Sequence, residues 1–243
     1  MAKIDLKTAS GLSLALDDNK LLSTDIKFKK QRDFSMEDLK SELLNNELTY
    51  PGIFYTKYFG LDNDSVFNEK NINMNLTVIP ANLAGIEYTK TKGYVVKGYP
   101  RIVEIINGSG TLLLQSFENT FEGDIIQSTI KKGQKLIIPA NYYSSFINTR
   151  QTTLVLLEIY AKQAEELYDL DDMNGMSYYV IRKNAKQEIV RNPIYKMVSK
   201  GRKVSWDNLL SQFNITLKTP VTKQILRKYE KFSWLFKTSD ISI

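Results

Sequence analysis

Residues 101–115 read Arg-Ile-Val-Glu-Ile-Ile-Asn-Gly-Ser-Gly-Thr-Leu-Leu-Leu-Gln, and this stretch decides the fold. Its apolar runs at 102–106 and 111–115 are short, and the turn-forming sequence Asn-Gly-Ser-Gly at 107–110 separates them. Two short runs joined by a glycine-rich turn predict a pair of antiparallel strands.

The same pattern continues on both sides of this pair. Turn formers at 131–133 and 139–141 separate further short runs, and none of these runs has the period of a long helix. Strands are predicted at 53–58, 75–79, 87–91, 124–130, 135–138, 145–149, 154–160 and 178–182, and irregular or edge-strand structure is predicted at 1–33. Many short strands at regular spacing are typical of an antiparallel barrel or jelly roll, so we predict an all-β fold.

Two helices are predicted outside the strand-rich region. Ser35 is the expected N-cap of a helix at 36–46, with Asp38 three positions later. Thr219 is the expected N-cap of a helix at 219–237, with Pro220 in its first position. The apolar residues of this second helix recur every three or four positions, which predicts one buried face.

The chain of 243 residues contains no cysteine and no histidine. This composition excludes disulfides, thiolate nucleophiles and imidazole as a base or metal ligand. A metal would need ligands that are all oxygen atoms, and no acidic spacing of the EF-hand type is present, so no metal and no cofactor are predicted. The apolar run at 11–16 is too short for a signal peptide or a membrane helix. We therefore expect a cytoplasmic protein.

The positive charge is concentrated at the C-terminus. The net charge is +6, and residues 197–243 contain nine basic and three acidic side chains, so residues 1–196 are neutral overall. Both tryptophans, Trp206 and Trp234, also lie after residue 196. This shift in composition predicts a globular domain over 1–196 and a basic extension over 197–243, which packs on that domain or on a partner.

The order of several motifs resembles the cupin-type glucose-6-phosphate isomerases, a metal-dependent family found largely in archaea. The resemblance is close over Asn75–Tyr195 and looser over about 20–75. It implies a cupin jelly roll, so together with the features above we predict a cupin jelly roll with a short N-terminal helix and a basic, partly helical C-terminal extension. The motifs are Thr77-Val78, Thr91-Lys92-Gly93, Gly108-Ser109-Gly110, Ile138-Pro139, Ile159-Tyr160 and Asn192-Pro193.

The resemblance also implies a degenerate metal site. Three histidines and a glutamate hold the metal in that family, and other residues stand at the matching positions: Tyr94, Val96, Arg101 and Ser144. Val96 has no donor atom, and Arg101 would repel a cation. Strand alternation directs Glu104 to the face opposite Arg101, so Glu104 does not replace the missing carboxylate.

Strand alternation directs Arg101 and Glu158 into the interior. Buried charges are costly unless they are paired, so we predict an ion pair between them. One interpretation is a metal-free active site, with Glu158 as the base and Arg101 or Tyr94 polarising a carbonyl group. The other is that these side chains fill a disused pocket.

Phosphate binding is a further hypothesis. Thr77, Thr91 and Gly93 match family positions near the sugar phosphate, and hydroxyl and backbone N–H groups suit an anion. Lys90 and Lys92 would add positive charge. The alternative is that Thr-Lys-Thr-Lys is an exposed strand with a solvated lysine face.

The extension supports three interpretations. It packs on the barrel through its aromatic side chains, or it docks into a protein partner or completes a homodimer, or its cations contact nucleic acid or an anionic membrane surface. No nucleic-acid motif accompanies the charge, which disfavours the third. The candidate contact residues are Trp206, Lys223, Arg227, Tyr229, Lys231, Phe232, Trp234 and Phe236.

Together these features favour a non-catalytic relative of a sugar-phosphate isomerase that serves as a binding or structural component of a protein assembly. The alternative is an active isomerase that interconverts glucose 6-phosphate and fructose 6-phosphate without a metal. A sugar phosphate is the small ligand expected in either case.

Overall fold

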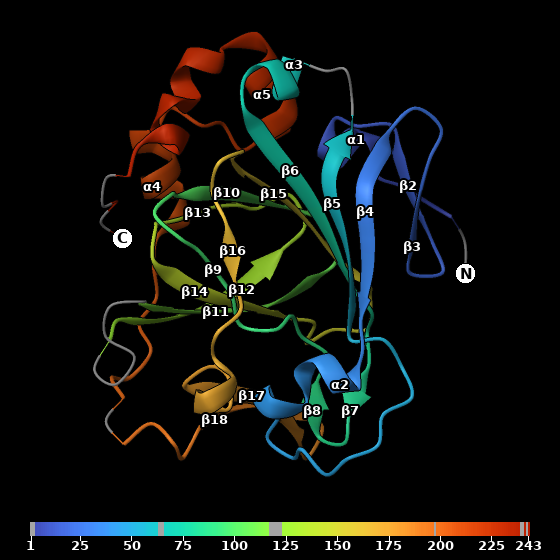
Figure 1. Cartoon of the computed structure of the whole chain (residues 1–243), viewed down its shortest axis with the longest axis vertical. Helices are drawn as coiled ribbons and strands as arrows, with labels where there is room; N and C mark the ends of the chain where they lie inside the picture. Colours follow the sequence, from blue (N-terminus) through green and yellow to red (C-terminus); the bar gives the residue numbers. More distant parts are fainter. Residues whose placement is uncertain (1–2, 63–65, 117–122, 197, 239–240, 242) are drawn as a thin grey trace.

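The computed structural model describes residues 3–62, 66–116, 123–196, 198–238, 241 and 243. Figure 1 shows a body of β-strands with short helices at both ends. The named strands pair with their neighbours in an antiparallel manner. The predicted all-β cupin jelly roll is therefore confirmed, although its sheets do not join into one closed barrel.

Two sheets make up the jelly roll, and the space between them is called the barrel interior below. The larger sheet has six strands in the order β13 (Lys135–Ile138), β10 (Arg101–Asn107), β15 (Leu154–Ala161), β6 (Ile72–Ile79), β5 (Tyr55–Asp62) and β4 (Lys27–Phe34). The smaller sheet has three strands in the order β12 (Ile125–Lys131), β11 (Ser109–Ser116) and β14 (Tyr142–Ile147).

Three small sheets flank these two. They are formed by β1 (Ile4–Asp5), β2 (Leu14–Asp17) and β3 (Lys20–Ser23); by β16 (Glu166–Leu167) and β9 (Val95–Val96); and by β18 (Lys186–Arg191), β17 (Tyr178–Lys183), β8 (Glu87–Tyr88) and β7 (Leu83–Ala84). The α-helices are α1 (Lys7–Ser10), α2 (Met36–Leu39), α3 (Val66–Glu69), α4 (Trp206–Gln212) and α5 (Val221–Arg227). The 3₁₀-helices are η1 (Lys40–Glu42), η2 (Asp171–Met173) and η3 (Tyr229–Phe236). Among the described residues, no helix has the length and hydropathy that a membrane span requires.

The two faces of the larger sheet differ in polarity. One face of β10 and β15 carries apolar side chains such as Ile102 and Leu157, which are fully buried. The other face carries Arg101 and Glu158 and is turned toward β14, where Ser144 accepts a hydrogen bond from Arg101. The polar face therefore lines the barrel interior, and the apolar face requires a cover on the outside.

The C-terminal extension supplies much of this cover. Helix α4 packs beside β13, and Figure 1 shows α4 and α5 at the same end of the molecule. Val221, Ile225 and Phe232 belong to the same hydrophobic cluster as Ile102 and Leu157. The extension thus packs on the barrel through its apolar side chains and shares the main core. The predicted boundary residue 197 lies outside the described residues.

One ion pair interrupts the apolar outer face. Lys135 Nζ lies 2.9 Å from Glu104 Oε1, and both side chains are buried. The remaining polar groups are satisfied by the extension, because Glu104 accepts the backbone N–H of Val221 at 2.9 Å and Lys135 donates to the carbonyl of Leu217 at 2.6 Å. Glu104 faces away from Arg101, as strand alternation predicts.

The first predicted helix is shorter than expected. Asp38 accepts the backbone N–H of Ser35 at 2.8 Å, so the predicted cap is present. Helical structure nevertheless ends at Glu42 instead of residue 46. Lys90 donates to the Glu42 carbonyl at 2.7 Å and the Gly93 N–H donates to the Glu42 carboxylate at 2.7 Å. The backbone becomes extended at Leu43, with φ −95° and ψ 148°, and Lys90 occupies the Glu42 carbonyl that a further helical turn would use.

The second predicted helix is divided in two. Helix α5 ends at Arg227, and Lys228, with φ −148° and ψ 65°, breaks the regular structure before η3 begins. The N-cap residue is Pro220, not Thr219, and Glu104 binds the first free N–H group. Helix α4 was not predicted.

We expect the packing of α5 to contribute strongly to stability. Ile225 is fully buried, whereas the adjacent Leu226 is 52% exposed. Replacing a buried isoleucine with alanine costs about 2–5 kcal/mol, so Ile225→Ala should lower the free energy of unfolding by that amount. Leu226→Ala is the control and should stay within about 0.5 kcal/mol of the wild type. Urea unfolding curves measure both, and equal effects would show that α5 is only loosely attached.

Candidate functional site

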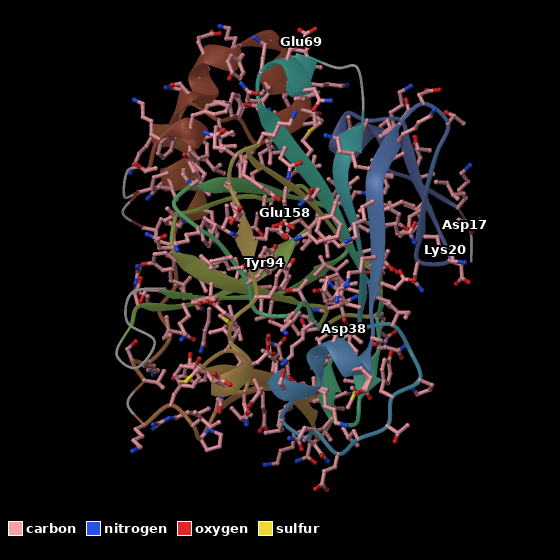
Figure 2. The ribbon with its side chains drawn as sticks, in the orientation of Figure 1. Asp17, Lys20, Asp38, Glu69, Tyr94 and Glu158 are labelled. Atoms are coloured by element: carbon pink, nitrogen blue, oxygen red, sulfur yellow. The ribbon has the colours of Figure 1, made fainter. Side chains whose placement is uncertain are left out.

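The polar face of the larger sheet and the residues opposite it form the candidate site. Figure 2 shows Tyr94 and Glu158 near the centre of the molecule. Glu158 lies on β15, directly between Val103 on β10 and Asn75 on β6. Tyr94 forms an isolated antiparallel bridge with Ser144 of β14. The site therefore joins strands from both sheets.

Glu158 is fully buried and is held between two cations. Its Oε1 lies 3.5 Å from Nε of Arg101, and its Oε2 lies 3.5 Å from Nζ of Lys57. The hydroxyl of Tyr94 donates a hydrogen bond to Oε1, and that of Thr77 donates to Oε2 at 3.3 Å. The predicted pair of Arg101 and Glu158 is present, but it is part of a larger network.

Lys57 extends this network to a second carboxylate, Glu166. Its Nζ lies 2.7 Å from Glu166 Oε1 and 4.2 Å from the centre of the Tyr94 ring. Glu166 also accepts hydrogen bonds from Tyr160 at 2.9 Å and from Tyr168 at 2.7 Å. Two carboxylates and two cations are thus buried together.

The ionisation of the network follows from these contacts. Burial alone would raise the pKa of Glu166, but the ammonium group of Lys57 and hydrogen bonds from Lys57, Tyr168 and Tyr160 lower it below its ordinary value. Burial, reinforced by the nearby carboxylates, raises the pKa of Tyr94, Tyr160 and Tyr168 well above the ordinary value. The tyrosines therefore stay protonated and act as donors to the carboxylates.

Sequence reasoning did not identify Lys57 and Glu166. Tyr55, Lys57 and Phe59 lie two positions apart on β5 and so share one face of the strand. A lysine between two aromatic residues on one strand face could have indicated a buried cation. Glu166 lies in a two-residue strand and pairs with a residue 109 positions earlier, so no local pattern indicates it.

The four positions that the resemblance aligns with metal ligands are all buried. Arg101 donates to the Ser144 hydroxyl and lies over the Tyr94 ring, 4.8 Å from its centre. Val96 lies on β9, where its backbone is paired with that of Glu166 on β16. Among the described residues, no three carboxylate, histidine or cysteine side chains are grouped to hold a metal ion. Because the charged groups at the centre include Lys57 and Arg101, a divalent cation does not fit here.

The three candidate phosphate residues already have partners within the chain. The Thr77 hydroxyl donates to Glu158, and the Thr91 hydroxyl accepts the Phe146 N–H at 3.0 Å. The Gly93 N–H donates to Glu42. Lys90 is buried and bonded to Glu87, so the Thr-Lys-Thr-Lys segment is not an exposed strand with a solvated face.

The candidate contact residues of the extension fall into two groups. The exposed group is Lys223, Arg227 and Lys231. The other group lies against the protein core, with Trp206, Phe232 and Trp234 buried and Tyr229 and Phe236 half-buried. The two groups do not form one surface.

Replacing Lys57 alone should lower the free energy of unfolding more than replacing Lys57 and its partner Glu166 together. Lys57→Met leaves Glu166 and Glu158 with one cation fewer, and breaking a buried pair costs about 3–5 kcal/mol. Lys57→Met combined with Glu166→Gln should recover part of this loss, since the second change removes an uncompensated charge. Urea denaturation of the single and double variants measures the coupling. If the loss of stability in the double variant equals the sum of the losses in the two single variants, Lys57 and Glu166 are not coupled and the prediction is wrong.

Glu42 should make the stability of the fold depend on pH. Burial raises its pKa from 4.5 to about 7, although the Gly93 N–H, Lys90 and Lys92 oppose this shift. The folded state therefore holds a proton that the unfolded state releases near pH 4.5, so the stabilising contribution of Glu42 is fully present below that pH and is lost as pH rises through 7.

In Glu42→Gln this loss should disappear. Between pH 4.5 and 8 the wild type should lose on the order of 3 kcal/mol relative to the variant. Urea denaturation across this range tests it, and parallel pH profiles for the two proteins would contradict it.

Comparison with known proteins identifies the family. The model of the family described as Glucose-6-phosphate isomerase (GPI) matches residues 32–197, more than half of the chain. The glucose-6-phosphate isomerase of Pyrococcus abyssi is 27% identical over 130 residues, which are 53% of this chain and 67% of that protein. The enzyme of Thermococcus kodakarensis is 27% identical over 168 residues, which are 66% of this chain and 85% of that protein.

A vicilin from Solanum melongena is a much more distant structural neighbour. It has a TM-score of 0.40 and 12% identity, and the match covers 50% of this chain and 32% of the vicilin. This distant similarity gives no information about the residues of the candidate site. The family match spans both sheets of the jelly roll and both halves of the buried network. The chain belongs to the glucose-6-phosphate isomerase family.

Proposed function

We propose that this chain is a non-catalytic member of its family and acts as a binding or structural component of a protein assembly. The observation that supports this most directly is the placement of Lys57 and Arg101 on either side of Glu158. These three side chains are at most 1% exposed. A sugar phosphate would have to displace them and break their ion pairs before it could reach Glu158.

The chemistry of isomerisation also supports this proposal. A metal-free isomerase needs a base that reaches the substrate and a group that polarises the carbonyl. Glu158 is the carboxylate predicted to act as the base, but Tyr94, Thr77 and both cations already engage its oxygens. Tyr94 and Arg101, the candidate electrophiles, are directed at Glu158 and Ser144. The groups that would perform catalysis bind one another.

The exposed part of the extension supports a role in assembly. On α5, the exposed residues Lys223, Leu226 and Arg227 are three and four positions apart and so share one face of the helix, where Leu226 is a large apolar side chain that is 52% exposed. A cationic face with an apolar centre is suited to an acidic protein surface, where charge complementarity guides association. Pairing of two such faces would bring like charges together, so we favour an acidic protein partner in the cytoplasm over a homodimer formed through this face.

The alternative is an active isomerase that works without a metal, and the hydrogen bond from Tyr94 to Glu158 is the observation in its favour. Purified protein should convert no fructose 6-phosphate to glucose 6-phosphate above the rate of a buffer blank. A coupled assay at pH 7 measures this, with and without an added divalent metal. Conversion that Glu158→Gln abolishes, while Glu37→Gln on the exposed part of α2 does not, would overturn the proposal.

A further inference from the structure

The C-terminal extension covers only part of the edge of β12. This strand is the outer one of the smaller sheet, and its Ile126 forms an isolated parallel bridge with Arg202. The Arg202 N–H donates to the Ile125 carbonyl at 2.9 Å, and the Gln127 N–H donates to the Arg202 carbonyl at 3.0 Å. The extension thus adds a single residue to the sheet as a parallel strand and then leaves it.

The next backbone groups along this edge are open. The polar groups of successive residues in a strand point to opposite sides, so those of Thr129 point away from β11, as those of Ile125 and Gln127 do. Lys131 follows the same alternation, because its N–H binds Gln134 Oε1 at 3.1 Å. Among the described residues, neither the Gln127 carbonyl nor the Thr129 N–H has a hydrogen-bond partner on this side.

A groove of about 370 Å³ begins where the pairing with the extension stops. Val204 would bind both open groups if the extension continued as a parallel strand, but Val204 and Lys203 line the groove instead. Residues from both faces of β12 also line it, namely the exposed Thr129 and Ser128, which accepts a hydrogen bond from Trp206 Nε1 at 3.2 Å. The groove therefore runs along the edge of the strand and not over one face.

The lining of the groove indicates what it can hold. Ile189 of β18 and Val204 are half-buried and belong to different hydrophobic clusters. Successive side chains of an extended chain point to opposite faces, so two neighbouring aliphatic residues of such a chain can contact Ile189 and Val204. Lys203 is exposed and is the one charged side chain among the described residues that line the groove, which favours an acidic neighbour.

We propose that this groove is a docking site for an extended segment of a protein partner, which adds to β12 as a parallel strand and continues the pairing that Arg202 begins. The segment carries neighbouring aliphatic residues and an acidic residue beside Lys203. Main-chain hydrogen bonds to the Gln127 carbonyl and the Thr129 N–H supply affinity, and the aliphatic contacts supply specificity.

The site is specific to the extension of this chain. Lys203, Val204 and Trp206 lie beyond residues 32–197, which the family model matches. The proposal goes beyond the proposed function, because it uses the edge of β12 and not the cationic face of α5. It holds whether or not the barrel has isomerase activity.

A second copy of the chain fits this edge less well. Two β12 edges related by a twofold axis would have to pair in an antiparallel manner along the same stretch. In each copy the segment at Arg202 already occupies that edge beside Ile125 and Gln127. A separate extended segment meets no such obstacle, because it needs only the open groups that follow.

Hydrogen exchange of the free protein tests whether the edge is open. The Thr129 amide should exchange at least about 100-fold faster than the amides of Ser128 and Ile130, which β11 protects. Amide exchange followed by NMR measures all three in the whole 243-residue chain. Equal protection of the three amides would show that the edge is covered and that the proposal is wrong.

Binding is tested with a random heptapeptide phage library selected on the protein, and the enriched peptide is then synthesised. Thr129→Pro removes the open N–H at an edge position, where a sheet tolerates proline, and should weaken peptide binding about tenfold. Thr129→Val is the matched control, because it keeps the N–H and the branched shape, and its affinity should stay within about twofold of the wild type. Isothermal titration calorimetry measures the three affinities.

Backbone methylation of the peptide tests the same bonds on the unchanged protein, so the test survives if Thr129→Pro does not fold. Methylating the peptide nitrogen that binds the Gln127 carbonyl should weaken binding about tenfold, whereas methylating the next nitrogen, which points to the other side, should not. The proposal fails if no selected peptide shows this alternation, or if Thr129→Pro and Thr129→Val bind the peptide equally.

Two other outcomes assign the occupant differently. A peptide that loses affinity for Arg227→Ala but not for Thr129→Pro binds the face of α5, which would support the proposed function and contradict the groove site. A dimer of the free protein that Thr129→Pro dissociates, measured by sedimentation, would show that a second copy fills the groove. That result would also overturn the proposal.

Discussion

The carboxylate of Glu158 can be buried in this fold only because Lys57 and Arg101 flank it. A buried charge without a partner is strongly destabilising, so each member of the network depends on the others. Glu166 completes the arrangement by engaging the second side of Lys57, and protonated tyrosines satisfy the remaining oxygens. This buried polar network lies among apolar side chains of both sheets, such as Val103 and Phe146, and it links the two sheets through the hydrogen bond from Arg101 to Ser144.

The sequence predicted the parts of this core that depend on local periodicity. The period of two along a strand separates Arg101 from Glu104 and directs Glu158 inward, which was enough to predict the central ion pair. Lys57 and Glu166 could not be paired in the same way, because they are 109 positions apart and one of them lies in a strand of two residues. The alignment of α2–η1 with Gly93 also depends on tertiary contacts, so the role of Glu42 was not predicted.

The extension shows the same division between local and long-range information. Its apolar spacing predicted a buried face, and Val221, Ile225 and Phe232 are indeed buried. The spacing did not predict the break at Lys228, nor that Glu104 on a distant strand would replace Thr219 as the cap. Both features depend on tertiary contacts, because the larger sheet turns its apolar face outward and α5 packs against it. The change in composition after residue 196 therefore marks a change in surface charge, while the hydrophobic core continues across it.

The contact between Glu104 and Val221 spans 117 positions, and that between Ser10 and Thr222 spans 212. During synthesis on the ribosome, β10 and β15 are complete long before α5 and Phe232 emerge. Their apolar surface stays exposed to solvent until then. Contacts between residues so far apart in sequence form slowly, and apolar surface that is exposed during folding is prone to aggregation. The nascent chain can therefore complete its hydrophobic cluster only after Phe232 has been synthesised.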